Sequence, residues 1–318
     1  MLAPDALPTF DAFQAFPEAP RRRHFIRRIK EELVRFEGQP LYPQRQCDTL
    51  GYPLSIEERR LYDATTEYID KTYNQARVLN RSAARLAMSV FQRRQTSSTY
   101  ALMRSFERRL ARLDEAIELV RAGRGDELER RQRRIGDRPD LFEALTADED
   151  ADDTGERHEE FEDAALSGVV AATLMDLRAE RRRVAGLLDR ARQLADSGED
   201  SKFEKLRDVL RNPDFAREKL IIFTEHRDTA EFLVRRLEGL GFTGQVAFIH
   251  GGLDYREREA QVELFRRPLA EGGAQYLGAT DAAGEGVNLQ FSWLMLTYEV
   301  TWIPARSEQR MGRIHSSG

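Results

Sequence analysis

The stretch KLIIFTEHRDTAEFL, residues 219–233, decides the fold class of this chain. It begins with a short apolar run that ends at Thr224 and continues with apolar residues at helical spacing. Three further apolar runs, at residues 245–249, 274–280 and 293–298, have the length of buried strands. The segments between the first three runs also have helical periodicity. Strands that alternate with helices predict an α/β fold, with a parallel sheet flanked by helices.

A large, mainly α-helical region is predicted before that sheet. From residue 21 to residue 211, apolar residues recur three and four positions apart, with stripes at 79–91, 102–117 and 170–188. These stripes predict packed helices or an antiparallel helical pair. A dense acidic block at 147–163 predicts a mobile loop. We therefore expect an N-terminal extension at 1–20, a helical region at 21–211 and an α/β lobe at 212–318, truncated at its end.

The composition limits the kinds of protein and of partner. The 318 residues, 41% of them hydrophobic, allow a buried core. Because 50 basic residues face 55 acidic ones, the net charge of -5 requires any DNA contact to come from a local patch. Basic clusters such as Arg93 and Arg94 could supply one, although such runs are more often solvated helix faces.

The cysteine count and the hydropathy pattern favour the cytoplasm. Cys47 is the only cysteine, which excludes an internal disulfide and a cysteine-based zinc site and favours a reducing compartment. No metal site is predicted. No apolar stretch approaches the roughly 18 residues that span a bilayer, so we expect no membrane partner.

Candidate binding residues follow the predicted strands. In a parallel sheet, ligands bind at the carboxyl ends of the strands. These ends are expected at Thr224, at residues 250–252, at Thr280 and at Glu299. After Thr280, a glycine-rich turn with free backbone N–H groups could face an anion.

A second cluster lies on a predicted helix after Pro304. Gln309 and Arg313 are four residues apart and so share one face of that helix, close to Arg310. The planar, permanently charged guanidinium of arginine suits a phosphate. The plainer interpretation is a solvated face with a salt bridge to Glu308, but the nearby glycine-rich turn favours a phosphate site.

Two motifs resemble those of a known family. ATDAAGEGVNLQ, residues 279–290, and EQRMGRIH, residues 308–315, resemble motifs V and VI of the Swi/Snf-like superfamily-two ATPases. KLIIFTEHRDTAEFL resembles motif IV, and the segments at 25–33, 52–69 and 91–110 resemble the helical region between the two lobes. Within this family, the motifs resemble in particular those of bacterial RapA/HepA-like proteins and of the helicase-like component of DISARM phage defence.

This resemblance implies a RecA-like second helicase lobe and a role for each motif. Arg313 would be an arginine finger, with Gln309 as its catalytic neighbour. The implied nucleotide-binding residues are Asp281, Gly284, Glu285, Gly286 and Arg310. The implied contacts with the DNA backbone are Thr224, Gly251, Gly252 and Thr280. Backbone contacts do not read bases, so the expected partner is double-stranded DNA of any sequence.

The other half of the ATP site has no counterpart in the sequence. A GxxxxGK motif followed by Ser or Thr is absent, so we expect a first RecA-like lobe of the same protein or complex to hold the β- and γ-phosphates. ATP with Mg²⁺ is expected only together with that lobe, and this chain alone should not hydrolyse ATP. Ser316 stands where the family has a second arginine.

Two alternatives follow from these departures from the family pattern. The chain could be a non-catalytic DNA-binding or protein-interaction module whose helical region serves as a platform for a protein partner. It could also be a subunit that is completed by a separately encoded first lobe.

Overall fold

The computed structural model describes residues 47–75, 81–136, 173–280, 289, 291–299 and 310. The chain divides into two units, Leu50–Ile314 and the termini Met1–Thr49 with His315–Gly318. All the elements described below belong to the first unit. The predicted extension at 1–20 and the acidic loop at 147–163 lie outside the described residues.

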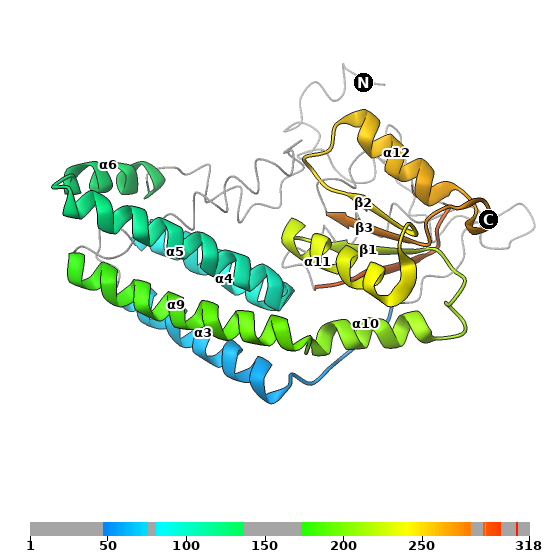
Figure 1. Cartoon of the computed structure of the whole chain (residues 1–318), viewed down its shortest axis with the longest axis horizontal. Coiled ribbons are helices and arrows are strands. Elements are labelled where there is room, and N and C mark those ends of the chain that lie inside the picture. The colour runs from blue at the N-terminus through cyan, green and yellow to red at the C-terminus, as the bar shows by residue number, and fades with distance from the viewer. Residues whose placement is uncertain are drawn as a thin grey trace, which may run out of the picture. The chain divides into compact units, whose positions relative to one another are not determined.

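Four long helices pack side by side as a bundle (Figure 1). They are α3 (Ile56–Gln75), α4 (Arg81–Ser97), α5 (Thr99–Arg121) and α9 (Leu174–Ser197), and the shorter α6 (Gly125–Gly136) follows α5. Side-chain caps fix two of the helix starts. The Ser98 hydroxyl accepts the N–H of Ala101, and the Thr173 hydroxyl accepts the N–H of Asp176. The expectation of packed helices is confirmed.

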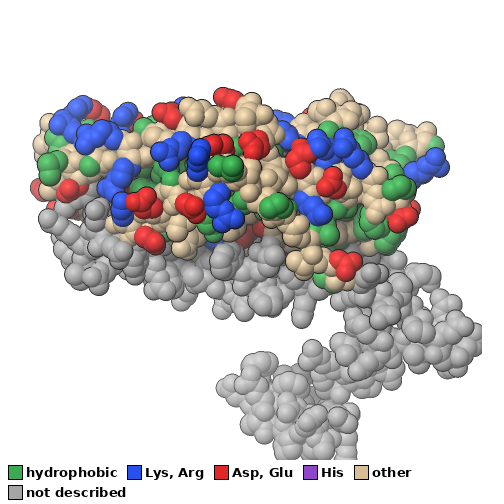
Figure 2. Space-filling model, turned by 90° about the horizontal axis from the view of Figure 1, so that it is seen from below, with side chains coloured by type: hydrophobic (Ala, Val, Ile, Leu, Met, Phe, Trp, Pro, Cys, Tyr) green, Lys and Arg blue, Asp and Glu red, His purple; other side chains and the backbone are tan. Residues whose placement is uncertain are grey.

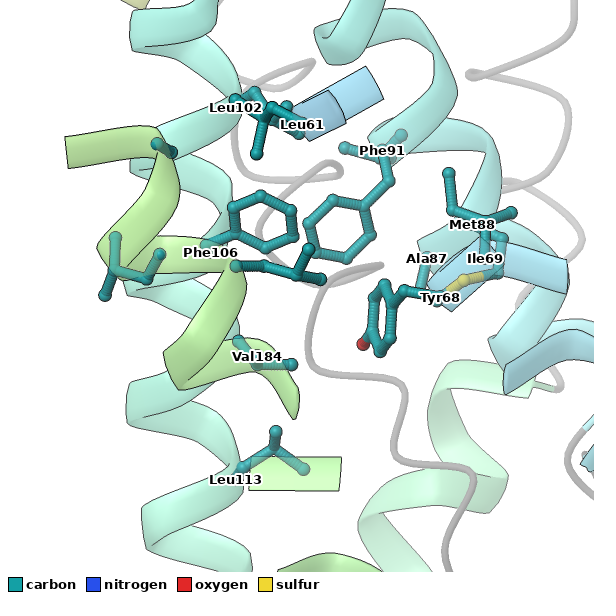
Figure 3. Close-up of a cluster of buried hydrophobic side chains, with 14 of the residues drawn as sticks. Leu61, Tyr68, Ile69, Ala87, Met88, Phe91, Leu102, Phe106, Leu113 and Val184 are labelled. Atoms are coloured by element: carbon teal, nitrogen blue, oxygen red, sulfur yellow. The ribbon is translucent and has the colours of Figure 1, made fainter. Parts of the chain in front are cut away.

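Apolar side chains at helical spacing fill the centre of this bundle (Figure 3). Phe91 of α4 and Phe106 of α5 stack with their ring centroids 5.3 Å apart, and Tyr68 of α3 meets both rings edge-on. Val184 joins the same core from α9. Burying a side chain such as Phe or Val contributes roughly 1.5–3 kcal/mol, so the predicted stripes account for the helix packing.

One buried ion pair also lies inside the bundle. Arg109 is fully buried, and its guanidinium donates from Nε at 3.1 Å and from Nη2 at 2.6 Å to Glu180 Oε1. The Tyr68 hydroxyl donates to the same oxygen at 2.9 Å. Burial acts to lower the pKa of Arg109, but the attraction of Glu180 outweighs it and raises that pKa. The guanidinium therefore stays charged, and the hydrogen bonds to Glu180 join α3, α5 and α9.

Four parallel strands form the sheet, in the order β2-β3-β1-β4. The strands are β1 (Leu220–Thr224), β2 (Val246–Ile249), β3 (Tyr276–Thr280) and β4 (Leu294–Thr297). Each strand lies within one of the four predicted apolar runs. The predicted α/β fold with a parallel sheet is therefore confirmed.

Alternate residues of β1 point to opposite faces of the sheet, and helices cover both faces. Ile221 and Phe223 pack in one core, to which α12 (Tyr255–Arg266) contributes. Leu220 and Ile222 pack in a second core with α10 (Ser201–Arg211) and α11 (Arg227–Leu237). Helix α10 is thus part of the lobe's core, although it precedes the predicted boundary at residue 212.

Only three residues, 198–200, separate the bundle from the lobe along the chain. Gly198 ends α9 in the left-handed conformation, with φ of 74°. Asp200 then starts α10, because its side chain accepts the N–H of Phe203 at 2.8 Å. Burial raises the pKa of Asp200. The last helix of the bundle therefore leads almost directly into the first helix of the lobe.

Candidate functional site

The carboxyl ends of the parallel strands form the candidate site. The register places Thr224 of β1 directly beside Thr280 of β3, and Ile249 of β2 beside Ala279. The turn that contains Gly251 therefore follows next to Thr280. Because β4 pairs with β1, Glu299 follows on the other side of β1. The fold thus brings the described strand-end residues to one edge of the sheet.

Glu299 joins the ends of β1 and β4. Its Oε1 accepts hydrogen bonds from the Thr224 hydroxyl at 2.7 Å, from the Glu225 N–H, and from the Ser97 hydroxyl at 3.3 Å. The side chain is buried, and its Oε2 accepts no hydrogen bond within the described structure. Since a buried carboxylate is costly without donors, these three donors hold Glu299 in place from two separate segments, the end of β1 and the end of α4.

Arginines of the helical region pair with acidic residues at the same edge. Arg93 Nη1 lies 3.0 Å from Glu225 Oε1. Asp228, in the first turn of α11, pairs with Arg94 and also with Arg108, whose Nη1 and Nη2 lie 2.8 and 3.1 Å from its oxygens. Burial acts to raise the pKa of Asp228, but Arg94 and Arg108 outweigh it and hold that pKa below its ordinary value.

These pairs correct one expectation from the sequence. Arg94 is buried, so the prediction of a solvated helix face is wrong for it. A phosphate contact does not fit Arg94 either, because its guanidinium pairs with Asp228 inside the protein. The basic pair on α4 therefore holds the helical region against the lobe.

The α4–α5 elbow, residues 96–98, meets the lobe at the same place. The hydroxyls of Ser97 and Ser98 hydrogen-bond the hydroxyl of Thr229, at 2.7 and 2.8 Å. Lys202 Nζ of α10 donates to the carbonyls of Thr96 and Ser97, each at 2.8 Å. The carbonyls at a helix C-terminus carry partial negative charge, so Lys202 stabilises the end of α4. Burial lowers the pKa of Lys202.

The four predicted DNA contacts lie in two environments. Thr224 is fully buried and donates its hydroxyl to Glu299, and Thr280 is only 6% exposed. Gly252 is exposed and Gly251 is half-buried in the turn after β2. A direct phosphate contact through the Thr224 hydroxyl therefore does not fit, because that group lies inside the protein. The glycine turn is the accessible part of the set.

Arg310 is the predicted nucleotide-binding residue that the structure describes. It is buried, and its guanidinium carbon lies 5.7 Å from the centroid of the Phe223 ring, one residue before the end of β1. The remaining predicted nucleotide-binding and catalytic residues lie outside the described residues: Asp281, Gly284, Glu285, Gly286, Gln309 and Arg313.

Sequence reasoning missed the contacts between the helical region and this edge. Ser97 and Glu299 are 202 residues apart, and Arg94 and Asp228 are 134 residues apart. Complementary charge was the available signal. It was not specific, because 50 basic and 55 acidic residues offer many such pairs.

The surface shown in Figure 2 carries both signs of charge. Basic and acidic side chains are interspersed over this face, and a broad basic surface is not seen on it. Such a mixture gives little general attraction to a phosphate backbone. Among the described residues, no helix combines the length and the apolar character that a membrane crossing requires.

Comparisons with known proteins give a family match in the C-terminal part of the chain. Residues 201–318 match the helicase conserved C-terminal domain. A 135-residue stretch is 38% identical to the uncharacterized ATP-dependent helicase YqhH of Bacillus subtilis and covers 42% of this chain and 22% of that protein. The SNF2 domain-containing protein CLASSY 4 of Arabidopsis thaliana is 26% identical over 140 residues, which are 42% of this chain and 12% of CLASSY 4.

A third relative is the RNA polymerase-associated protein RapA of Sodalis glossinidius. It is 32% identical over 108 residues, which are 33% of this chain and 10% of RapA. Residues 201–318 thus resemble the C-terminal domain of helicases. The family match and these relatives agree with the second helicase lobe that the motifs predicted. The chain spans 22% or less of the length of each of these relatives.

Proposed function

We propose that this chain is the C-terminal half of a DNA-dependent ATPase that translocates along double-stranded DNA. In this proposal the lobe supplies one side of the ATP site, through the motif V and motif VI residues. It also contacts the DNA backbone through the Gly251–Gly252 turn, which follows next to Thr280. The observation that carries the proposal is the match of residues 201–318 to a helicase C-terminal domain.

The accessible glycine turn supports the DNA part of this proposal. Glycines let a backbone N–H approach a phosphate closely, because no side chain stands between them. Such contacts do not depend on base identity. The lobe would therefore bind the DNA backbone at one edge of its sheet. A motor that steps along DNA of any sequence requires such contacts.

The ATP part of the proposal needs a second lobe. Arg313 would stabilise the charge that develops on the transferring phosphate, with Gln309 beside it. Asp281, Gly284, Glu285, Gly286 and Arg310 would line the nucleotide. The sequence has no phosphate-loop motif, so Mg²⁺ and the β- and γ-phosphates would be held by the first lobe. ATP would then be hydrolysed only where the two lobes meet.

ATP turnover by the purified chain, alone and mixed with a candidate first lobe, tests this proposal. We expect negligible turnover by the chain alone and DNA-stimulated turnover by the mixture. Magnesium-dependent turnover by the chain alone would contradict the half-site. DNA binding without turnover in the mixture would favour the non-catalytic module.

The arginine finger is tested in the same mixture. Arg313→Ala should slow hydrolysis by roughly a thousandfold or more, because one charge contact is lost in the transition state. DNA binding should change little. Arg267→Ala is the matched control, since Arg267 is exposed at the end of α12. Equal turnover by the two variants would overturn the role of Arg313.

DNA binding is measured separately, by fluorescence anisotropy with short labelled duplexes. Duplexes of unrelated sequence should bind equally, and the affinity should fall linearly with salt on a double-logarithmic plot. Double-stranded RNA is the comparison. If RNA duplexes bind more tightly than DNA duplexes, the assignment of DNA as the partner is wrong.

A further inference from the structure

The helical region and the lobe converge on the end of β1. Glu225, the first residue after β1, has its backbone N–H bound by Glu299 and its carboxylate paired with Arg93 of α4. The Thr224 hydroxyl and the Ser97 hydroxyl donate to the same oxygen of Glu299. One buried carboxylate therefore connects the α4–α5 elbow to the last residues of β1.

We propose that Glu299 is a positioning residue. Through it, the α4–α5 elbow fixes the position of the carboxyl end of β1, at the edge of the sheet that binds the DNA backbone. This inference rests on the proposed function for its DNA readout. Glu299 is buried. It acts on Thr224 and Glu225, and Thr224 lies directly beside Thr280 in the sheet. A shift of the elbow would thus move two neighbouring strand ends.

The chemistry of the junction favours positioning over direct phosphate binding. The side chains of Arg93 and Arg94 are 10% and 4% exposed, and both form ion pairs with the lobe. The Ser97 hydroxyl also hydrogen-bonds the Thr229 hydroxyl and donates to Glu299. The Lys202 ammonium donates to the two elbow carbonyls of Thr96 and Ser97. Buried polar groups of this kind demand specific geometry, because each unpaired group costs free energy. The junction therefore favours a single arrangement of elbow and strand end.

The second oxygen of Glu299 adds to this argument. Oε2 is buried and accepts no hydrogen bond within the described structure, while Oε1 accepts three. A purely structural carboxylate would be expected to use both oxygens. Glu299 is therefore held through one oxygen alone. The loss of one of its three donors should weaken the hydrogen bonds from the other two.

Four variants of the full chain test the proposal. Glu299→Gln keeps the side-chain size but removes the charge, and Ser97→Ala removes the donor of the elbow. The double variant tests whether these two act together. Thr96→Ala is the matched control, because it removes a neighbouring hydroxyl that bonds only within its own helix, to the Arg93 carbonyl at 2.8 Å.

Two readouts follow each variant: hydrogen exchange of the Glu225 amide by NMR, and affinity for a labelled DNA duplex at several salt concentrations. We expect Glu299→Gln to speed the exchange about tenfold, because it weakens the acceptor of the Glu225 N–H. Ser97→Ala should speed it about two- to threefold, because it removes only a second donor to that acceptor. DNA affinity should fall in the same order with an unchanged salt slope. The double variant should resemble Glu299→Gln alone, and Thr96→Ala should resemble the wild type.

Two outcomes would overturn the proposal. One is wild-type exchange at Glu225 in Ser97→Ala, which would mean that the elbow does not reach the strand end. The other is full DNA affinity in variants whose Glu225 exchange is fast. If the wild-type chain does not bind DNA at all, the proposed function fails instead. The exchange data alone then decide whether the elbow sets the strand end.

Discussion

The bundle and the α/β lobe place their buried polar groups differently. The bundle buries the Arg109–Glu180 pair among the apolar side chains of its core. The two cores of the sheet are apolar, and the buried carboxylates of Asp228 and Glu299 lie near the carboxyl ends of the strands. Strand pairing already satisfies the backbone within the sheet. Charged groups can therefore concentrate at the edge where ligands bind, while in the bundle they specify which helices pack together.

The buried pair of the bundle should have the largest effect on stability. Glu180→Ala leaves a fully buried guanidinium without its partner, so the free energy of unfolding should fall by about 3–5 kcal/mol. Urea unfolding followed by circular dichroism measures this change. Glu118→Ala is the control on the same bundle, because it breaks the exposed Arg121–Glu118 pair and should cost less than about 1 kcal/mol. Equal losses in the two variants would show that the buried pair does not specify the packing.

The junction pair should have a smaller and pH-dependent effect. Asp228→Asn removes the charge that faces Arg94 and Arg108, and we expect a loss of about 2–3 kcal/mol at neutral pH, since Arg108 is partly exposed. The pKa of Asp228 lies below its ordinary value of 3.8 when folded. Its stabilisation is therefore present above that value and disappears as the pH falls through the lower, folded pKa.

Unfolding measured from neutral pH down to acid tests this sign. The difference between wild type and Asp228→Asn should shrink below pH 3.8. A difference that stays constant with pH would mean that the carboxylate charge is not what holds the junction.

The apolar core of the sheet should give the smallest effect of the three. Ile221→Val removes one buried methylene from β1 and should cost about 0.5–1.5 kcal/mol. Because no charge is involved, this loss should not depend on pH. Thermal unfolding at two pH values checks both points. If the stability loss in Ile221→Val depended strongly on pH, the sheet core and the junction would not differ in the way described.

The sequence predicted regular elements better than long-range polar contacts. The four strands were found because an apolar run such as LIIFT has a local signature. The packed helices were found because apolar residues such as Phe106 and Leu113 recur at helical spacing. The meeting of the strand ends followed from parallel pairing alone. The nucleotide-binding residues of motifs V and VI stay predictions.

The role of Glu299 could not be predicted in this way. Its partners Thr224 and Ser97 come from segments 75 and 202 residues away, and no periodicity links such positions. The burial of Arg94 was missed for the same reason, because a basic helix face has the same pattern whether it meets water or a carboxylate. Tertiary pairing decides between these cases.

The short link between α9 and α10 has a mechanical consequence. With three linking residues and the elbow contacts on the lobe, the bundle should turn with the lobe as a lever. Helix α9 has 24 residues, so at 1.5 Å per residue it is about 36 Å long. A lobe rotation of about 10° would then displace the far end of that lever by roughly 6 Å, about four residues of helical rise.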